Sequence, residues 1–164
     1  MRATWDTVVR WADCDPAGIA YHARIFDWFS EGRIAWLAKM DLDYYQIFRP
    51  RRIELLVLEA GARFHRPLYP GDAVSVEVAP ARLSPVRMRF RYRVVQKSQG
   101  VAAEGFTEHA FVVDGRAVRL DRRFPEGYER LLHGALDAGG GFRTGPGSAS
   151  GEGGEGHGSD AVRQ

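Results

Sequence analysis

The first segment of the chain alternates between apolar and polar positions, and this period of two is typical of a half-buried β-strand. One face of the predicted strand carries Trp5, Thr7, Val9 and Trp11. From about Tyr21 to Lys39 the apolar residues recur at helical spacing instead, with Ile25, Phe29 and Trp36 on one side. Gly32 interrupts this helix, and a residue without a side chain allows close packing against a sheet.

The part of the chain after this helix has the pattern of β-strands. Strands are predicted over 52–65, 73–78, 87–94, 106–113 and 116–120. A turn is expected at Pro70–Asp72, and Asp114–Gly115 is a strong signal for a two-residue hairpin. One long helix can cover the apolar face of such a sheet. The order of elements therefore predicts an α+β domain in which an antiparallel sheet of five or six strands packs on one long helix.

The composition divides the chain near His133. Residues 134–164 hold 11 of the 19 glycines and one aromatic residue, Phe142. Such a segment buries too little apolar surface to offset the entropy of ordering it. We therefore expect one folded domain at residues 1–133 and a disordered glycine-rich tail at residues 134–164.

Charge and cysteine content exclude several classes of protein. The net charge is only +2, and no nucleic-acid-binding module accompanies the arginines. Cys14 is the single cysteine, and no histidine pair has the spacing of a metal site. No secretory signal and no apolar run of membrane-spanning length is present. We expect a cytoplasmic protein without metal, nucleic-acid or membrane partners.

The segment between the first strand and the helix is the best candidate for chemistry. Asp15, Pro16 and Gly18 stand at the first, second and fourth positions expected of a β-turn. The turn precedes a helix N-terminus, whose free N–H groups can stabilise a developing oxyanion. Spacing alone leaves Asp15 either a turn former or a catalytic carboxylate. The neighbouring Asp13 is expected to orient the loop or to pair with an arginine.

Two motifs resemble the hotdog-fold thioesterases of the 4-hydroxybenzoyl-CoA thioesterase type, in which a sheet wraps around one central helix. The first is Trp11–His22, WADCDPAGIAYH, followed by Ile25–Arg33. The second is Ala62–Asp72, which is similar to the family's recurring Phe-x-x-Pro-x-x-x-Gly-Asp hinge between strands. With the strand order, the resemblance extends over roughly residues 4–130.

The resemblance implies hydrolysis of an acyl-CoA thioester without a metal or an organic cofactor. The expected acyl group is aromatic or of short to medium length. Asp15 matches the family's catalytic aspartate, and the backbone N–H of His22 matches its oxyanion donor. Gly18 and Tyr21 are expected to contact substrate. The residues do not decide whether Asp15 attacks the thioester or activates a water. The resemblance also implies edge-to-edge homodimers, often paired into tetramers, with active sites at the subunit interface.

The part of the site that would bind the phosphates of CoA departs from the family pattern. The family often has a basic cluster in the turn before the fourth strand, whereas this chain has Ser84, Pro85 and Val86 there. The flanking Arg82 and Arg87 are the predicted phosphate contacts. The departure leaves a thioesterase for carrier-protein-bound acyl groups as one alternative. A non-enzymatic acyl-CoA-binding module is another, although such a module would not need Asp15.

Overall fold

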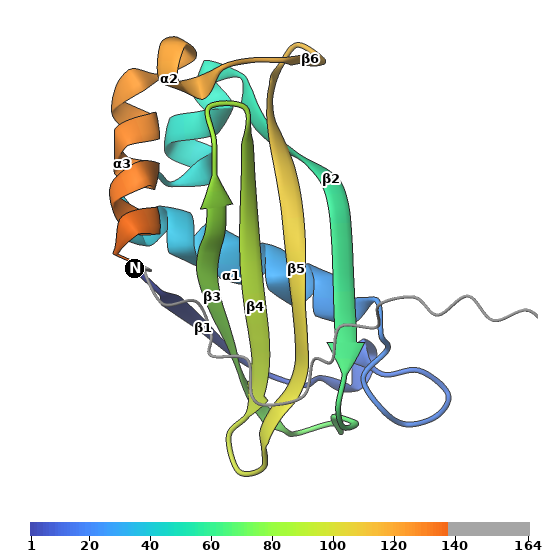
Figure 1. Cartoon of the computed structure of the whole chain (residues 1–164). Helices are drawn as coiled ribbons and strands as arrows, with labels where there is room; N and C mark the ends of the chain where they lie inside the picture. Colours follow the sequence, from blue (N-terminus) through green and yellow to red (C-terminus); the bar gives the residue numbers. More distant parts are fainter. Residues whose placement is uncertain (138–164) are drawn as a thin grey trace, which may run out of the picture.

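Six strands form one antiparallel sheet in the order β1-β3-β4-β5-β2, with β6 paired to the end of β5. This computed structural model describes residues 1–137. The strands are β1 (Ala3–Val8), β2 (Ile53–Phe64), β3 (Ala73–Leu83), β4 (Arg87–Gln96), β5 (Gly100–Val113) and β6 (Arg116–Ala117). The helices are α1 (Arg24–Lys39), α2 (Leu120–Arg123) and α3 (Pro125–Leu136). The sheet curls around α1, which lies behind it in Figure 1. The predicted α+β hotdog architecture is confirmed.

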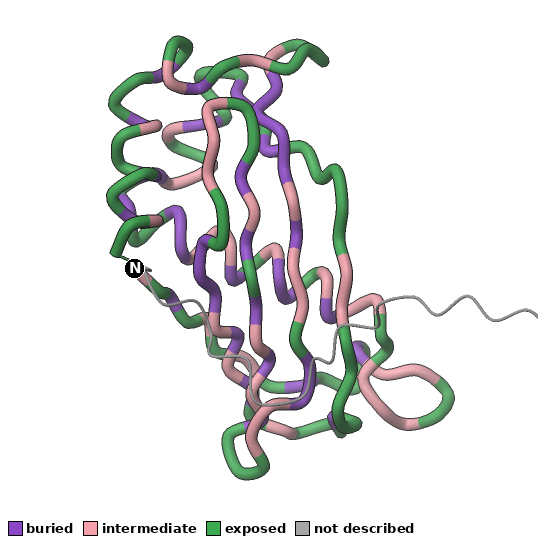
Figure 2. Tube along the Cα trace, in the orientation of Figure 1, coloured by how far each residue is buried: buried purple, intermediate pink, exposed green. Residues whose placement is uncertain are grey.

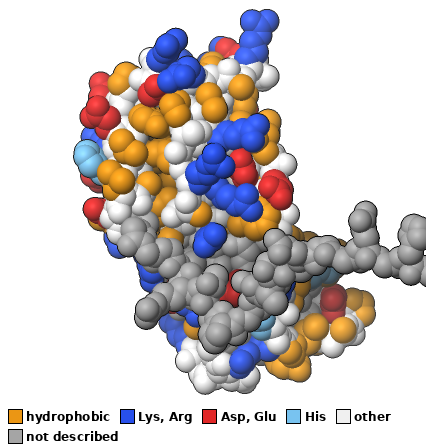
Figure 3. All heavy atoms as spheres, viewed as in Figure 1, with side chains coloured by type: hydrophobic (Ala, Val, Ile, Leu, Met, Phe, Trp, Pro, Cys, Tyr) orange, Lys and Arg blue, Asp and Glu red, His pale blue; other side chains and the backbone are white. Residues whose placement is uncertain are grey.

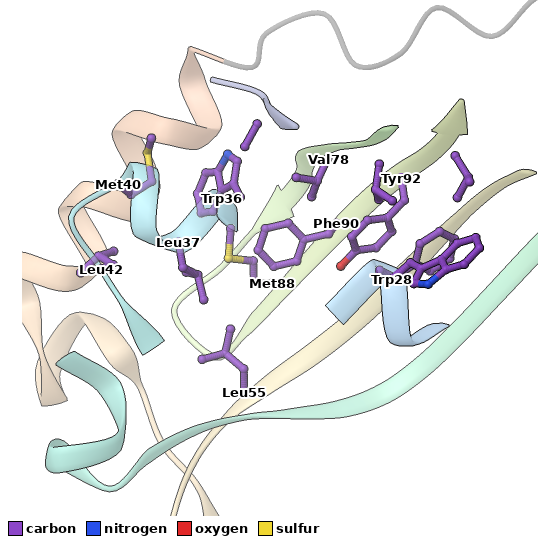
Figure 4. Close-up of a cluster of buried hydrophobic side chains, with 14 of the residues drawn as sticks. Trp28, Trp36, Leu37, Met40, Leu42, Leu55, Val78, Met88, Phe90 and Tyr92 are labelled. Atoms are coloured by element: carbon purple, nitrogen blue, oxygen red, sulfur yellow. The ribbon is translucent and has the colours of Figure 1, made fainter. Parts of the chain in front are cut away.

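Strict alternation along β4 decides which side of the sheet faces the helix. Met88, Phe90, Tyr92 and Val94 are buried on the inner face, and the intervening arginines lie on the outer face. Figure 4 shows Met88, Phe90 and Tyr92 beside Trp28, Trp36 and Leu37 of α1. Because successive strand residues point to opposite faces, this pattern fixes the register of β4 in the sheet.

Close contact between α1 and the sheet depends on a small residue in the helix. A Cβ atom added to Gly32 would lie 3.1 Å from Cγ1 of Val76 in β3. The ring of Phe29 stacks on that of Tyr92 with their centroids 4.3 Å apart, and Trp36 meets Phe90 edge to face. The expectation that Gly32 allows close packing is confirmed.

Two predicted strands are too long. β1 ends at Val8, and Trp11 begins a short 3-10 helix, Trp11–Asp13, where its side chain is 80% exposed. The strand predicted over 116–120 keeps only Arg116 and Ala117, because Leu120 turns into α2 and buries its side chain. The hairpin between β5 and β6 is confirmed, since Asp114 and Gly115 both have the positive φ that its turn requires.

The spacing of apolar residues did not predict the C-terminal helix α3, which crosses the predicted domain boundary at residue 133. It continues to Leu136 because Gly134 is buried against Trp36 and Met40, where a side chain would not fit. Residues 134–136 therefore belong to the folded domain rather than to the predicted tail. The rest of that predicted tail, residues 138–164, lies outside the described residues.

A chain of polar side chains crosses the core between β4, β5 and α1. His109 is fully buried, and its Nδ1 lies 3.3 Å from the Leu55 carbonyl oxygen. Since a carbonyl only accepts, Nδ1 carries the proton and Nε2 accepts from Arg33 at 3.3 Å and Thr107 at 2.8 Å. The Tyr92 hydroxyl completes the chain, 2.7 Å from that of Thr107. Every ring nitrogen of this buried histidine is thus satisfied in its neutral form.

Acidification should destabilise the fold through His109. Burial, followed by the nearby Arg33 charge, lowers its pKa from 6.5 to about 4. The unfolded chain then binds more protons than the folded one between these pH values, so stability falls as the pH falls. Between pH 7 and pH 5 we expect a loss of about 2 kcal/mol from this residue. Urea unfolding at both pH values measures the loss, and His109→Gln should show a flatter pH dependence. An equally steep dependence in the variant would assign the effect to other groups.

Within residues 1–137, no helix combines the length and the apolar character needed to cross a membrane.

Candidate active site

The loop between β1 and α1 is held by backbone hydrogen bonds around Asp15. The Gly18 N–H donates to the Asp15 carbonyl at 2.9 Å, which closes the predicted turn, and Gly18 has a φ of +76°. The Asp15 N–H donates to the Ile19 carbonyl at 3.0 Å, and the Ala17 N–H donates to Oδ1 of Asp15 at 2.8 Å. The predicted turn-forming role of Asp15 is therefore present, and it uses only one carboxylate oxygen. Among residues 1–137, Oδ2 has no hydrogen-bond donor.

Asp13 has a structural role in the same loop. Its carboxylate is 1% exposed and accepts from the Arg10 side chain at 3.0 and 3.1 Å, with Arg24 at 3.9 Å. The hydrogen bonds from Arg10 hold the pKa of Asp13 below its ordinary value. Its carbonyl oxygen also accepts from the Tyr21 N–H at 2.8 Å. The prediction that Asp13 pairs with an arginine is confirmed.

A cavity of about 550 Å³ lies beside this loop. Asp15, Ile19, Ala20, His22 and Ile25 form one wall, from the loop and the first turn of α1. The opposite wall comes from the end of β2, the hinge after it and the start of β5. It consists of Phe64, His65, Arg66, Pro67, Leu68, Ala102 and Ala103. The cavity therefore combines a carboxylate with mostly apolar walls, and the helix start is part of its lining.

The start of α1 has two backbone donors without acceptors. The N–H groups of Arg24, Ile25 and Phe26 donate to carbonyls three residues earlier. Within the described part of the chain, no group accepts from the N–H of His22 or of Ala23. A helix N-terminus carries a partial positive charge and free donors, which suit a developing negative oxygen. The structure thus brings Asp15 and His22 together at one cavity.

The other predicted substrate residues are divided between the two ends of the molecule. Gly18 is in the Asp15 turn, and the ring of Tyr21 meets that of His22 edge to face next to the cavity. Arg82 and Arg87 do not line the cavity. Arg87 of β4 pairs with Ala110 of β5, whereas the cavity is lined by Ala103, which lies seven residues away along β5. That separation is about 23 Å at 3.3 Å per residue.

On the outer face of the sheet, three of the four β4 arginines pair with glutamates. Arg87 and Arg89 lie 3.4 and 3.2 Å from Glu108, and Arg93 lies within 3.6 Å of Glu77 and Glu104. Figure 3 shows basic and acidic side chains side by side on this face. The arginines are largely neutralised there, which agrees with a solvated outer surface.

Two basic residues of the cavity wall were not predicted as site residues. His65 and Arg66 follow β2 directly, and Nε2 of His65 lies 3.3 Å from Glu104. Their place in the hinge motif between Phe64 and Asp72 was the signal in the sequence that could have identified them.

No group of three or more side chains that could hold a metal ion is present in residues 1–137.

Comparisons with known proteins identify relatives of the chain among thioesterases. The chain is 30% identical over 105 residues to the 1,4-dihydroxy-2-naphthoyl-CoA hydrolase of Thermosynechococcus vestitus, covering 64% of this chain and 72% of the relative. A crystal structure of a Thermus thermophilus protein of unassigned function is 30% identical, with a TM-score of 0.76 over 82% of this chain and 98% of that one. The DHNA-CoA thioesterase of Staphylococcus aureus shares the fold at 22% identity, with a TM-score of 0.80 over 86% and 96% of the two chains. The family model of the thioesterase-like superfamily matches residues 9–130, and the chain belongs to that family.

Proposed function

We propose that the protein hydrolyses the thioester of an aromatic acyl-CoA to the free acid and CoA. The observation that carries this proposal is the pairing of a carboxylate oxygen of Asp15 with the unsatisfied His22 N–H at one largely apolar cavity. A thioester needs both groups, a nucleophile or base on one side and an oxyanion donor on the other. The related hydrolase of Thermosynechococcus vestitus, which acts on a naphthoyl-CoA by its name, supports an aromatic acyl group.

Asp15 can act by either of two routes. In the first, its carboxylate attacks the thioester carbon, the C–S bond breaks, and the CoA thiolate takes up a proton; water then hydrolyses the resulting mixed anhydride. In the second, Asp15 removes a proton from water as the water oxygen attacks the same carbon; the C–S bond of the resulting tetrahedral intermediate then breaks, and the CoA thiolate takes up the proton from Asp15. In both routes the negative carbonyl oxygen is stabilised by the N–H group of His22 at the start of α1.

The walls of the cavity suit a flat apolar group. Ile25, Phe64 and Leu68 provide apolar surface. Packing of an aryl ring against the phenyl ring of Phe64 contributes about 0.5–1.5 kcal/mol of binding free energy beyond that of burying the apolar surface. CoA thioesters are made and consumed inside cells, so we also propose a cytoplasmic location for this protein.

We further propose that the working unit is a homodimer joined along β2. This strand is one of the two edges of the sheet, the other being β1, and Figure 2 shows most of β2 exposed. It carries the exposed apolar residues Leu56, Val57, Leu58 and Phe64. An exposed apolar edge strand is a template for pairing with another strand. Since Phe64 is also part of the cavity wall, a second copy on this edge would adjoin the cavity.

A panel of thioesters tests the proposed reaction. We expect the wild-type protein to hydrolyse benzoyl-CoA and hydroxynaphthoyl-CoA with kcat/KM of about 10⁴ M⁻¹ s⁻¹ or more. Straight-chain acyl-CoAs should be poorer substrates because they give up the ring contacts with Phe64. Thiol release measured with a chromogenic reagent gives the rates. Hydrolysis of acyl carrier protein thioesters but of no CoA ester would contradict the proposal.

A further inference from the structure

A β-bulge interrupts β5 where the strand borders the cavity of the candidate active site. The register of β4 against β5 shifts between Val94 and Val95, and the shift leaves Ala102 without a partner on β4. An extra residue of this kind changes the direction of neighbouring side chains, and such bulges are common beside active sites. Ala102 and Ala103 are consecutive, yet both are 1% exposed and both line the cavity. In a regular strand, one of the two would point to the opposite face of the sheet.

Hydrogen bonds hold this bulge against the hinge that follows β2. The carbonyl oxygen of Ala102 accepts from the N–H groups of His65 and Arg66 at 2.8 and 3.2 Å. The side chain of Arg66 also donates to the carbonyl of Gln99, in the turn between β4 and β5. A larger side chain at either alanine would therefore extend into the cavity, because the backbone that carries it is tied on both sides.

The two alanines belong to the deep part of the cavity. On the same wall Phe64 is 51% exposed, and the three residues after it are exposed as well, so this segment surrounds the opening. The part of the lining that is buried consists of Ile25, Leu68, Ala102 and Ala103. Two of these four side chains are single methyl groups, so the depth of the cavity depends on the alanines.

The space next to the alanines, along the inner face of β5, is already filled. Ala103 and Gly105 face inward, since they pair with the inner-face residues Val94 and Tyr92 of β4. A Cβ atom added to Gly105 would lie 2.5 Å from the ring of Phe29. Phe29 is fully buried and stacked on Tyr92, and a ring packed in this way leaves no room for a ligand. The cavity therefore ends at Ala103 in this direction.

The proposed reaction directs the acyl group toward these alanines. The thioester carbonyl must lie beside Asp15 and the His22 N–H, on the wall formed by the loop and the helix start. The buried apolar part of the cavity then receives the acyl group, and the polar CoA chain leaves through the exposed opening. A cavity of about 550 Å³ is large enough to enclose most of a ligand of moderate size, and a single ring would leave part of it empty.

We propose that Ala102 and Ala103 of this bulge determine the largest acyl group that the protein hydrolyses. The inference rests on the proposed thioesterase function and adds to it the residues that select the acyl group. With a methyl group at both positions, the buried part of the cavity admits a flat two-ring aroyl group. A larger residue at either position shortens that space and restricts the protein to a single ring.

Stepwise enlargement of the alanines tests this selection. Ala103→Val and Ala103→Leu place an isopropyl and an isobutyl group in the cavity. We expect kcat/KM for naphthoyl-CoA to fall relative to that for benzoyl-CoA by roughly 10–100-fold in the leucine variant, and by less in the valine variant. Ala102→Val should shift the ratio in the same direction. Thiol release gives both rates on one sample, and their ratio does not depend on the fraction of the sample that is folded.

Ala110→Leu is the matched control on the same strand. Ala110 is 8% exposed and does not line the cavity, so leucine there strains the packing without entering the acyl site. We expect a lower Tm and an unchanged ratio of the two rates. The comparison separates a change of cavity shape from a general loss of stability, and Ala103→Val supplies the same test with a smaller disturbance of the packing.

Binding of inert ligands distinguishes this inference from the proposed function. Thioethers of CoA that carry a naphthylmethyl or a benzyl group have no carbonyl to hydrolyse, and titration calorimetry gives their Kd. Ala103→Leu should weaken binding of the naphthylmethyl thioether by roughly 10–100-fold and change that of the benzyl thioether little.

The outcomes are distinct for the two proposals. If the naphthoyl-to-benzoyl ratio is the same in Ala103→Leu and in the wild type, or shifts equally in Ala110→Leu, the inference is overturned. Loss of both thioethers to the same extent in Ala103→Leu would overturn it as well. A wild-type protein that hydrolyses neither ester, but binds the thioethers with the expected dependence on size, would refute the proposed function and support the size limit set by the alanines.

Discussion

Asparagine at position 15 should reduce kcat for an aroyl-CoA by roughly 10³–10⁴-fold, because it removes the nucleophile or general base. The substitution is close to isosteric, and the asparagine Oδ1 can still accept the 2.8 Å hydrogen bond from the Ala17 N–H. The turn, and with it the position of the free His22 N–H, should therefore persist. Steady-state thiol release and a thermal melt on the same sample measure the two properties. We expect the activity to be lost and the Tm to remain close to that of the wild type.

Asp13→Asn is the matched control, two residues away in the same loop. Asp13 is buried and bonded to Arg10 and Arg24, so its neutralisation should lower the stability of the loop by about 1–3 kcal/mol. Its effect on activity should follow its effect on folding, in contrast to Asp15→Asn. If Asp15→Asn retained more than a tenth of the wild-type kcat, Asp15 would be a turn former only. Equal losses of activity and stability in both variants would lead to the same conclusion.

Lysine at Leu58 should convert the expected dimer into a monomer and reduce aroyl-CoA hydrolysis with it. Leu58 is 47% exposed near the middle of the edge strand β2, at the β-bulge between Val57 and Glu59. In a two-fold pairing along β2 the central residues of the two copies approach each other. Two lysines would then bring like charges together at the centre of the interface, which costs several kcal/mol. Light scattering coupled to size-exclusion chromatography measures the mass, and the thiol assay measures the activity.

Leu136→Lys is the control for this substitution. Leu136 is 67% exposed at the end of α3, on a different part of the molecule, so the same change of residue should leave the mass and the activity unaltered. A wild-type protein that is monomeric at micromolar concentration would contradict the β2-paired dimer. So would a Leu58→Lys variant that remains a fully active dimer.

Periodicity predicted the parts of the fold that have one buried and one exposed face. The alternation from Arg87 to Val94 predicts β4, and the spacing of Ile25, Phe29 and Trp36 predicts α1, because each pattern follows directly from burial on one side. α3 was missed because its buried residues include Gly127 and Gly134, which make room for large neighbours instead of adding apolar side chains. A pattern of apolar residues cannot show a contact of this kind.

The candidate site also has one part that the sequence could predict and one part that it could not. Asp15 and His22 are close in sequence and are joined by one turn, so a motif can identify both. His65 and Arg66 lie in the hinge motif between Phe64 and Asp72, but that motif does not show which part of the loop and helix they face. Arg66 lines the same cavity as Asp15 because β2 pairs with β5 in the folded sheet. Sheet pairing joins residues that are far apart in sequence, so local spacing can mark the motif but not the cavity that it lines.

The two walls of the Asp15 cavity come from separate parts of the chain. The carboxylate and the backbone donors belong to the loop and the helix start at residues 15–25, whereas Phe64, Leu68 and Ala103 form the opposite wall. Substitutions on that opposite wall can change the shape available to the acyl group without moving the reacting atoms. A lineage that keeps the loop and varies the strand ends can therefore acquire new substrates one residue at a time, with hydrolysis retained at every step.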